Sequence, residues 1–200
     1  MCITGLMDSR DGDDMTTSIV RWRKLDGRGL EVLRLHTEPG ALVARSHVVE
    51  AGEAPFAVSY EWRLDSRWRT RSLHVTVYQE SERELHIDRT GDSSWSIDRT
   101  ARPDLDECEE IDLAITPFCN TLALRRFGPP PGGAGELTTL YVGFPDLSIS
   151  PSRQRYEQLD SQVFRYIDLG LNQGFEADLT VDEQGLVRHY PQLFERLEQP

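Results

Sequence analysis

Cysteine is scarce in this sequence. Its 200 residues include only Cys2, Cys108 and Cys119, and no two of them form a CxxC pair, so they do not make a disulfide framework. The first fifteen residues have no charged n-region and no long apolar run, which leaves no recognisable secretory signal. No apolar segment approaches the length of a membrane span. We therefore expect a cytoplasmic protein without a membrane span.

Motifs for metal binding and nucleophilic catalysis are missing as well. Five histidines are scattered along the chain without an HxxxH or HExxH pair, although zinc ligands normally follow a recognisable spacing. There is no GxSxG motif. The glycine-rich segment 128–135 lacks the GKS or GKT ending of a phosphate-binding loop. We predict no catalytic residues, no metal and no cofactor.

The net charge of −12 provides no general basic surface for nucleic acid, so nucleic acid is not an expected partner. Hydrophobic residues make up 38% of the chain and charged residues 28%, as in soluble globular proteins. Residues 1–17 are acidic and show no periodic pattern. We expect them to be a disordered lead, and residues 18–200 to form a single domain.

One stretch, residues 116–127, has the pattern of a helix. Thr116 can accept a hydrogen bond from a first-turn N–H group, and Pro117 suits the first helical position. Apolar side chains follow on one side, and Arg125 and Arg126 lie where cations complement the helix dipole. An apolar helix of this length is only marginally stable alone. The surrounding strands are therefore expected to wrap it.

The rest of the chain has the pattern of short strands with turns at intervals of about eight to twelve residues, which is typical of an all-β roll or barrel. Apolar residues take even positions in the segment 60–68 and odd positions in 73–77, and this switch predicts a β-bulge near Ser72. Residues 191–198 could add a short helical turn, because three apolar residues fall on one side: Leu193, Phe194 and Leu197. That segment is the alternative candidate for the central helix.

Several motifs are similar to those of one bacterial family. They are Cys108-x-Glu110-x-Asp112, Thr116-Pro117, Asn120-Thr121-Leu122, Arg125-Arg126, Pro145-Asp146-Leu147, Arg153-Gln154-Arg155-Tyr156, Asp182-x-x-Gly185-Leu186-Val187 and Tyr190-Pro191-x-Leu193-Phe194. On these residues the chain resembles the family described as "putative glycolipid-binding", with a departure at Ala123, where we expect the family to have proline. The resemblance implies a mainly β, single-domain spiral β-roll, in which a highly curved antiparallel sheet wraps around one central helix. It also implies a homodimer, and it brings no catalytic residues.

Aromatic and arginine side chains are the candidates for a ligand site. Flat amphipathic rings can stack on sugars, and arginines can hold phosphate or carboxylate head groups bidentately. The selected residues are Trp62, Trp68, Tyr156, Arg125, Arg126 and Arg155. Arg125 and Arg126, at the helix end beside a proline- and glycine-rich loop, are the preferred polar rim of an apolar pocket. For any single residue, burial in the core or pairing with an acid is the simpler role.

The favoured function is non-catalytic binding of an amphipathic small molecule, with a glycolipid as the class that the resemblance implies. One alternative is an enzyme that acts on a sugar or lipid conjugate through an unrecognised carboxylate site, for which the acidic segment 104–112 offers candidates. A second alternative is a dimeric scaffold without a ligand. An apolar cavity open to solvent favours the binding protein, converging carboxylates or a bound metal favour the enzyme, and a solid interior favours the scaffold.

Overall fold

The computed structural model describes residues 17–127 and 132–198. The expected lead, residues 1–17, lies outside this part of the chain except for Thr17, where the first strand begins. The described residues form strands, one α-helix, α1 (Phe118–Phe127), and a short 3-10 helix, η1 (Pro103–Leu105). None of the described helices is long and apolar enough to cross a membrane.

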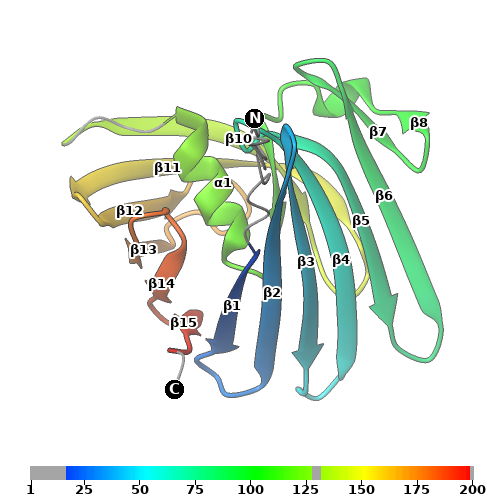
Figure 1. Cartoon of the computed structure of the whole chain (residues 1–200), viewed down its shortest axis with the longest axis horizontal. Helices are drawn as coiled ribbons and strands as arrows, with labels where there is room; N and C mark the ends of the chain where they lie inside the picture. The colour runs from blue at the N-terminus through cyan, green and yellow to red at the C-terminus, as the bar shows by residue number, and fades with distance from the viewer. Residues whose placement is uncertain (1–16, 128–131, 199–200) are drawn as a thin grey trace, which may run out of the picture.

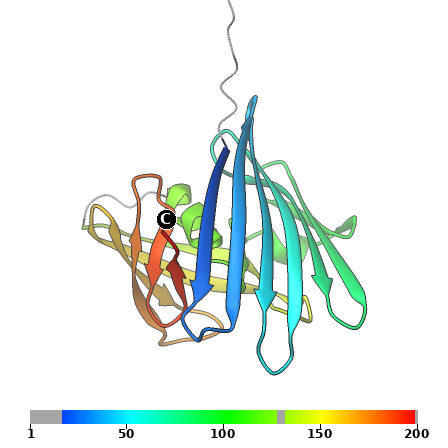
Figure 2. The same ribbon diagram turned by 60° about the horizontal axis from the view of Figure 1, so that its bottom comes forward.

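The strands are β1 (Thr17–Lys24), β2 (Gly29–Glu38), β3 (Ala41–Glu50), β4 (Phe56–Asp65), β5 (Thr70–Tyr78), β6 (Glu82–Thr90), β7 (Ser94–Ile97), β8 (Thr100–Ala101), β9 (Glu110–Leu113), β10 (Ala134–Val142), β11 (Ile149–Asp160), β12 (Val163–Asp168), β13 (Glu176–Val181), β14 (Val187–Tyr190) and β15 (Phe194–Arg196). All fifteen belong to one sheet, in the order β8-β7-β6-β5-β4-β3-β2-β1-β15-β14-β13-β12-β11-β10-β9. Neighbouring strands are antiparallel except β9 and β10, which are parallel. The sheet is open, and it curls around α1 (Figures 1 and 2). The predicted mainly β roll with one central helix is confirmed.

The helix begins as the sequence predicts. The backbone N–H of Phe118 donates to Thr116 Oγ1 at 3.1 Å, so the threonine hydroxyl satisfies a first-turn donor that has no partner within the helix. Phe118 and Leu122 are fully buried, and Phe118 packs edge-on against Trp62 with ring centroids 5.8 Å apart. The helix is therefore held by tertiary packing, as its short length requires.

The predicted bulge is present between β4 and β5. Arg63 pairs with Ser72 and Leu64 with Thr70, which leaves Arg71 as the additional residue. A bulge changes which positions face inward, so the inner face continues from Thr70 to Leu73, both buried, while Arg71 remains exposed. The parity switch in the sequence therefore marked a real change of register.

The prediction of a helical turn at residues 191–198 is wrong. Phe194–Arg196 forms strand β15, which pairs with β1 on one side and with β14 on the other. Gln192, with a φ angle of 70°, lies in the tight turn that reverses the chain between β14 and β15. Apolar spacing over so few residues fits a helix or a strand equally well. Here the segment became a strand because it pairs with β1 on one side and with β14 on the other.

The two edge strands of the sheet, β8 and β9, are short. The segment that joins them in the sequence contacts the strands next to β8. The indole Nε1 of Trp95 on β7 donates to the carbonyl of Cys108 at 2.9 Å, and Arg89 on β6 donates to the carbonyl of Glu109 at 2.9 Å. The chain from β8 to β9 thus connects the two ends of the open sheet. The homodimer expected from the sequence stays a prediction.

Candidate functional site

A pocket of about 140 Å³ lies near the N-terminal end of α1. We call it the tyrosine pocket and define it by three groups of lining residues: the rings of Tyr141, Tyr166, Phe175 and Tyr190, the polar residues Asp112, Cys119, Asn120, Ser152, Asp168 and Asn172, and the rim residues Leu171 and Leu193. Leu171 and Leu193 are 49% and 38% exposed, whereas Asn120 and Asp168 are buried. The buried part of the pocket therefore carries polar groups among aromatic rings, and two exposed leucines lie at its rim.

Several elements contribute to this pocket. Asp112 comes from β9, Asn120 from the first turns of α1, Tyr166 and Asp168 from β12, and Tyr190 from β14. The curl of the sheet turns the inner faces of these strands toward the helix (Figure 2). Tyr166 and Tyr190 have ring centroids 6.0 Å apart, a distance typical of packed aromatic pairs.

Neutral donors hold the carboxylate of Asp112. The thiol of Cys119 donates to Oδ1 at 3.0 Å, and the amide of Gln154 donates to Oδ2 at 2.5 Å. The network continues through Tyr156, whose hydroxyl receives a hydrogen bond from Asn120 Nδ2 at 2.9 Å and donates to Gln154 Oε1 at 3.3 Å. Burial raises the pKa of Asp112, while the bonds from Cys119 and Gln154 lower it in part.

A second carboxylate, Asp168, lies in the same pocket. The backbone N–H of Gly170 donates to its Oδ1 at 2.7 Å, and the Tyr166 hydroxyl donates to Oδ2 at 3.4 Å. Asn172 Nδ2 also donates to Oδ2, at 3.5 Å. Burial, and then the nearby charge of Asp112, raise the pKa of the Tyr166 phenol and of the Tyr190 phenol. Both phenols are therefore neutral near pH 7 and can donate hydrogen bonds.

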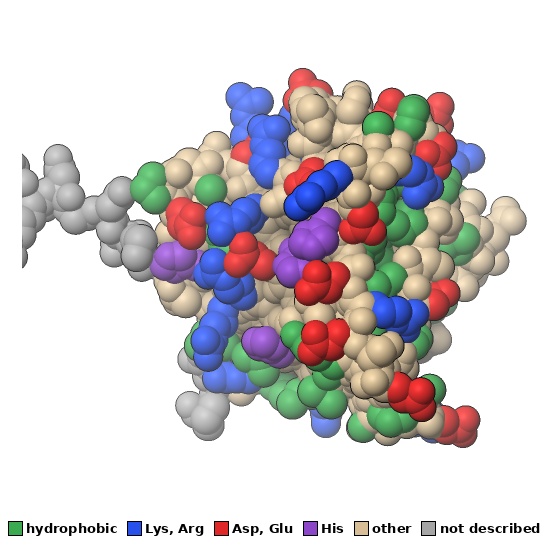
Figure 3. All heavy atoms as spheres, turned by 90° about the vertical axis from the view of Figure 1, so that its right-hand side faces the viewer, with side chains coloured by type: hydrophobic (Ala, Val, Ile, Leu, Met, Phe, Trp, Pro, Cys, Tyr) green, Lys and Arg blue, Asp and Glu red, His purple; other side chains and the backbone are tan. Residues whose placement is uncertain are grey.

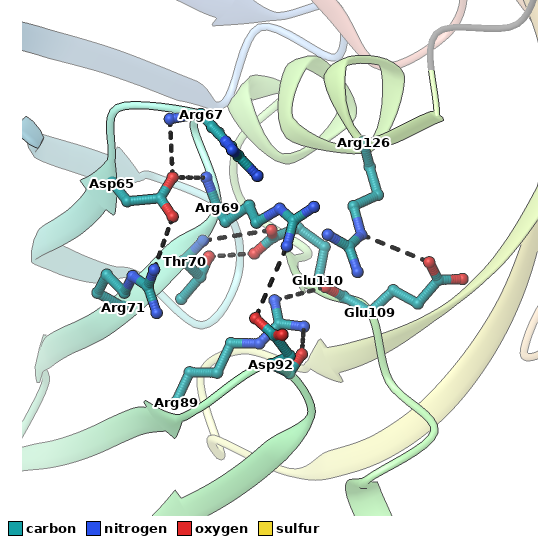
Figure 4. A network of polar contacts seen from close by, with 10 residues as sticks. All are labelled: Asp65, Arg67, Arg69, Thr70, Arg71, Arg89, Asp92, Glu109, Glu110 and Arg126. Atoms are coloured by element: carbon teal, nitrogen blue, oxygen red, sulfur yellow. Dashed lines mark hydrogen bonds and ion pairs between the residues drawn. The ribbon is translucent and has the colours of Figure 1, made fainter.

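A second cavity, of about 170 Å³, lies at the C-terminal part of α1. We call it the arginine cavity; its lining residues are Arg67, Trp68, Arg69, Glu110, Leu122, Arg125 and Arg126. The guanidinium of Arg125 lies 3.9 Å from the centre of the Trp68 ring and donates to the carbonyl of Gln184 at 2.6 Å. Arg126 forms an ion pair with Glu109 at 3.4 Å (Figure 4).

Most other charges around the arginine cavity are also engaged. Glu110 is buried and accepts hydrogen bonds from the Thr70 backbone N–H at 3.3 Å and from the Thr70 hydroxyl; burial raises its pKa. Arg89 donates to the backbone carbonyls of Glu109 and Asp92 (Figure 4). Within residues 17–127 and 132–198, no hydrogen bond or ion pair engages the guanidinium of Arg67. The cavity therefore keeps a positive charge that an anionic group could use.

The family model described as "Putative glycolipid-binding" matches residues 19–196. The chain belongs to this family. A crystal structure of a DUF1089 family protein from Pseudomonas aeruginosa is similar to it, with 35% sequence identity and a TM-score of 0.76, over 85% of this chain and 92% of that one. A comparison with functionally curated proteins found no significant match.

The sequence predicted six ligand residues for this member of the family. Three of them lie together in one cavity. Arg125, Arg126 and Trp68 all line the arginine cavity. Trp62 does not line this cavity: it is fully buried in the core, and its indole N–H donates to Thr70 Oγ1 at 2.8 Å. Tyr156 is also fully buried, in the network beneath the tyrosine pocket.

The sixth predicted residue, Arg155, lies apart from both cavities. It alternates with the inward-facing Tyr156 on β11 and forms ion pairs with Glu136 at 3.5 Å and Glu157 at 2.8 Å. This arrangement matches the simpler role considered for it, pairing with an acid. Whether any of the six residues contacts a ligand stays a prediction.

The tyrosine pocket was missed in the selection of site residues, although a signal was present. Asp112, Asn120, Gln154 and Tyr190, which carry part of the resemblance to the glycolipid-binding family, all lie in or directly beneath this pocket. They are separated by up to 78 positions in the sequence, so spacing could not show that they meet. Tyr166 and Asp168 lie outside the matching motifs and offered no such signal.

Proposed function

We propose that this protein binds an amphipathic small molecule of the glycolipid class without changing it chemically, and that the sugar-like head group occupies the tyrosine pocket. The proposal rests on the change in polarity across that pocket: carboxylate and amide groups are buried inside it, and leucines are exposed at its rim. A molecule with one hydroxylated end and one apolar end matches this change in polarity. The family description, which names glycolipid binding, supports the same class.

The chemistry of the lining fits hydroxyl groups. Carboxylates such as Asp112 and Asp168 accept hydrogen bonds from sugar hydroxyls, and neutral phenols and amides can both donate and accept. Aromatic rings such as Tyr141 and Phe175 offer flat faces for the C–H surface of a sugar ring. A few placed polar groups in an otherwise aromatic lining are what orient a small ligand.

The size of the pocket limits which part of the ligand it holds. Sites for drug-sized ligands have volumes of roughly 300–1,000 Å³, and this pocket has about 140 Å³. It therefore accommodates a head group, and the hydrocarbon part lies along the exposed rim at Leu171 and Leu193. Each CH₂ group removed from water there contributes about 0.8 kcal/mol.

Calorimetric titration with alkyl glycosides below their micelle concentration tests the proposal. We expect an alkyl glycoside to bind more tightly than either the free sugar or an alkyl alcohol of the same chain length. Tyr141→Ala, which removes a half-buried ring, and Leu171→Ser, which changes the exposed rim, should each weaken binding by about tenfold, or 1.4 kcal/mol. Arg155→Ala, on the outer face, is the matched control and should leave the affinity unchanged.

The arginine cavity is the competing location for the head group, because Arg67 and Arg125 could pair with an anionic ligand there. In that case alkyl sulfates or phosphates would bind more tightly than neutral glycosides. The double change Arg125→Ala/Arg126→Ala would then abolish binding, and Tyr141→Ala would have no effect. This result would move the site to the other end of α1.

An enzyme is the second candidate, and a specific observation favours it. Asp112 and Asp168 line one pocket, and the pKa of Asp112 is raised by burial, as is often found for one member of an acid–base pair. Against it, hydrogen-bond donors from the protein already engage both carboxylates. Incubation with a panel of aryl glycosides and esters, followed by mass spectrometry, decides the matter. Product formation that disappears in Asp112→Asn would establish an enzyme; no product is expected.

A further inference from the structure

The outer face of the sheet carries a cluster of metal-ligating side chains that belongs to neither cavity. His74 on β5 and His86 on β6 are direct partners in the antiparallel register, and their rings stack with centroids 4.0 Å apart. Glu84 is two positions before His86 and points to the same face. Its Oε2 atom lies 3.8 Å from His74 Nε2 and 3.6 Å from His86 Nε2. Figure 3 looks onto this side of the molecule and shows histidines with acidic side chains beside them.

The geometry points to a binding site for a borderline divalent cation, above all Zn²⁺, held by His74, Glu84 and His86. Two imidazole nitrogens and one carboxylate oxygen are ligands that zinc takes readily, whereas Mg²⁺ and Ca²⁺ prefer oxygen alone. The three ligand atoms lie within 4.8 Å of one another. Bonds of about 2.0–2.1 Å at tetrahedral angles place donor atoms about 3.3–3.4 Å apart. The contacts of Glu84 exceed that spacing by only a few tenths of an ångström.

The cluster lacks the partners that would otherwise explain it. Within residues 17–127 and 132–198, Glu84 has no arginine or lysine partner, and His74 Nε2 has no hydrogen-bond partner and no contact with solvent. The neighbouring arginines, Arg45 and Arg63, are both paired with Glu61, at 2.7 and 2.9 Å. A carboxylate and two imidazoles are thus left together, without a competing cation, on a protein of net charge −12.

Small side-chain movements complete the site. The two rings are nearly parallel, with an interplanar angle of 10°, so each must rotate about its Cβ–Cγ bond before both Nε2 lone pairs point at one ion. The side chains of His86 and Glu84 are 49% and 57% exposed, which leaves room for that rotation. The backbone at His86 is held in place: His86 N donates to Asp98 Oδ1 at 2.9 Å, and Asp98 N donates to His86 O at 2.8 Å.

The sequence predicted no metal site because it offers no recognisable motif. His74 and His86 are twelve positions apart, a separation outside the usual spacings of paired ligands. Only the register of the β5–β6 hairpin makes them neighbours. This site is independent of the proposed function, because its residues line neither the tyrosine pocket nor the arginine cavity.

Titration of the full, tag-free chain with Zn²⁺ after treatment with a chelator tests the inference. We expect a single ion per chain and an increase in melting temperature, because the ion connects two strands of the native state. His74→Ala and His86→Ala should each lower the affinity by about tenfold or more, and the double variant should not bind. His189→Ala on β14 is the matched control and should bind as the unchanged chain does.

The spectrum of bound Co²⁺ identifies the ligands. Nitrogen and oxygen ligands give visible d–d bands without the strong near-ultraviolet thiolate charge-transfer band, so that band would assign the ion to a cysteine and overturn the inference. Absence of Zn²⁺ binding, or binding that the His74→Ala/His86→Ala double variant retains, would equally overturn it.

Discussion

Strand β9 places two carboxylic acids, only two residues apart, in two different environments. Glu110 lines the arginine cavity, where Thr70 donates to it and Arg89 is a nearby cation. Asp112 lines the tyrosine pocket, where the neutral donors Cys119 and Gln154 bond to it. The strand and the residue chemistry are the same at both positions. The difference between the two positions therefore comes from their neighbours: a cation lies near Glu110, and neutral donors surround Asp112.

Helix α1 connects these two environments. Its first turns supply Cys119 and Asn120 to the tyrosine pocket, and its last turns supply Arg125 and Arg126 to the arginine cavity. The arrangement of cations agrees with the helix dipole, which favours positive charge at the C-terminal end. One short helix, once wrapped by the sheet, therefore positions residues in both candidate sites.

Removal of the helix packing is expected to have the largest effect. Leu122 is fully buried within the roll, and Leu122→Ala should lower the free energy of unfolding by about 2–5 kcal/mol, as is typical of a packed leucine. Both cavities should then lose their ligand properties together. Chemical denaturation measures the loss, with the exposed Leu171→Ala as control, for which less than about 0.5 kcal/mol is expected. A loss below about 1 kcal/mol for Leu122→Ala would contradict the central role of the helix.

The pH dependence of stability is expected to rank second. Burial raises the pKa of Glu31 from 4.5 to about 7, although the hydroxyls of Ser46 and Tyr60 lower it in part. A raised pKa means that the folded state holds this proton more tightly, so the stabilisation is complete below about pH 4.5 and is lost as the pH rises through about 7. At 1.36 kcal/mol per unit, this amounts to roughly 3 kcal/mol at most.

Glu31→Gln separates this effect from those of Glu110 and Asp112, whose pKa values are also raised by burial. Denaturation curves between pH 4.5 and 8 should show a shallower fall for the variant than for the unchanged chain. A comparison of Glu110→Gln with Asp112→Asn then shows which of the two environments on β9 contributes more to the remaining slope. Identical slopes for the unchanged chain and Glu31→Gln would contradict the assignment of Glu31.

The smallest effect on stability is expected at the arginine cavity. Arg125→Ala/Arg126→Ala removes a cation–π contact, a hydrogen bond to the Gln184 carbonyl and a partly exposed ion pair, which together contribute about 2 kcal/mol. If the head group lies in the tyrosine pocket, the affinity for a neutral alkyl glycoside should not change. A melting curve and a titration of the same variant make the comparison. If the arginine variant lost more affinity than Tyr141→Ala, the head group would be assigned to the arginine cavity instead.

Local chemistry in the sequence was sufficient for some elements. Thr116 and Pro117 marked the start of the helix because capping depends on neighbouring residues only. The shift of apolar parity before Leu73 marked the bulge at Arg71 because alternation reports directly which side of a strand faces inward. The resemblance motifs indicated the family that the family model also matches, over residues 19–196.

The remaining features depended on contacts between distant parts of the chain. Arg126 pairs with Glu109 of the acidic segment 104–112, whereas Arg125 lies on the Trp68 ring and donates to the carbonyl of Gln184. An acidic partner and an aromatic ring with a backbone carbonyl can each stabilise a guanidinium at a helix end. The partner of each arginine is decided by the distant segments that the curled sheet brings beside the helix.

The sequence by itself determined a mainly β chain and a helix within residues 116–127, because periodicity, capping and turn residues act over a few positions; it left 191–198 open as a second candidate helix. Only the tertiary structure decided that residues 194–196 form a strand, that Asp112 and Asp168 share a pocket, and that His74 faces His86. Each of these results depends on strand pairing within the sheet: Phe194 pairs with Lys24 as well as with Tyr190, and His74 pairs with His86. Local patterns carry no information on such partners, because register is fixed by the whole sheet.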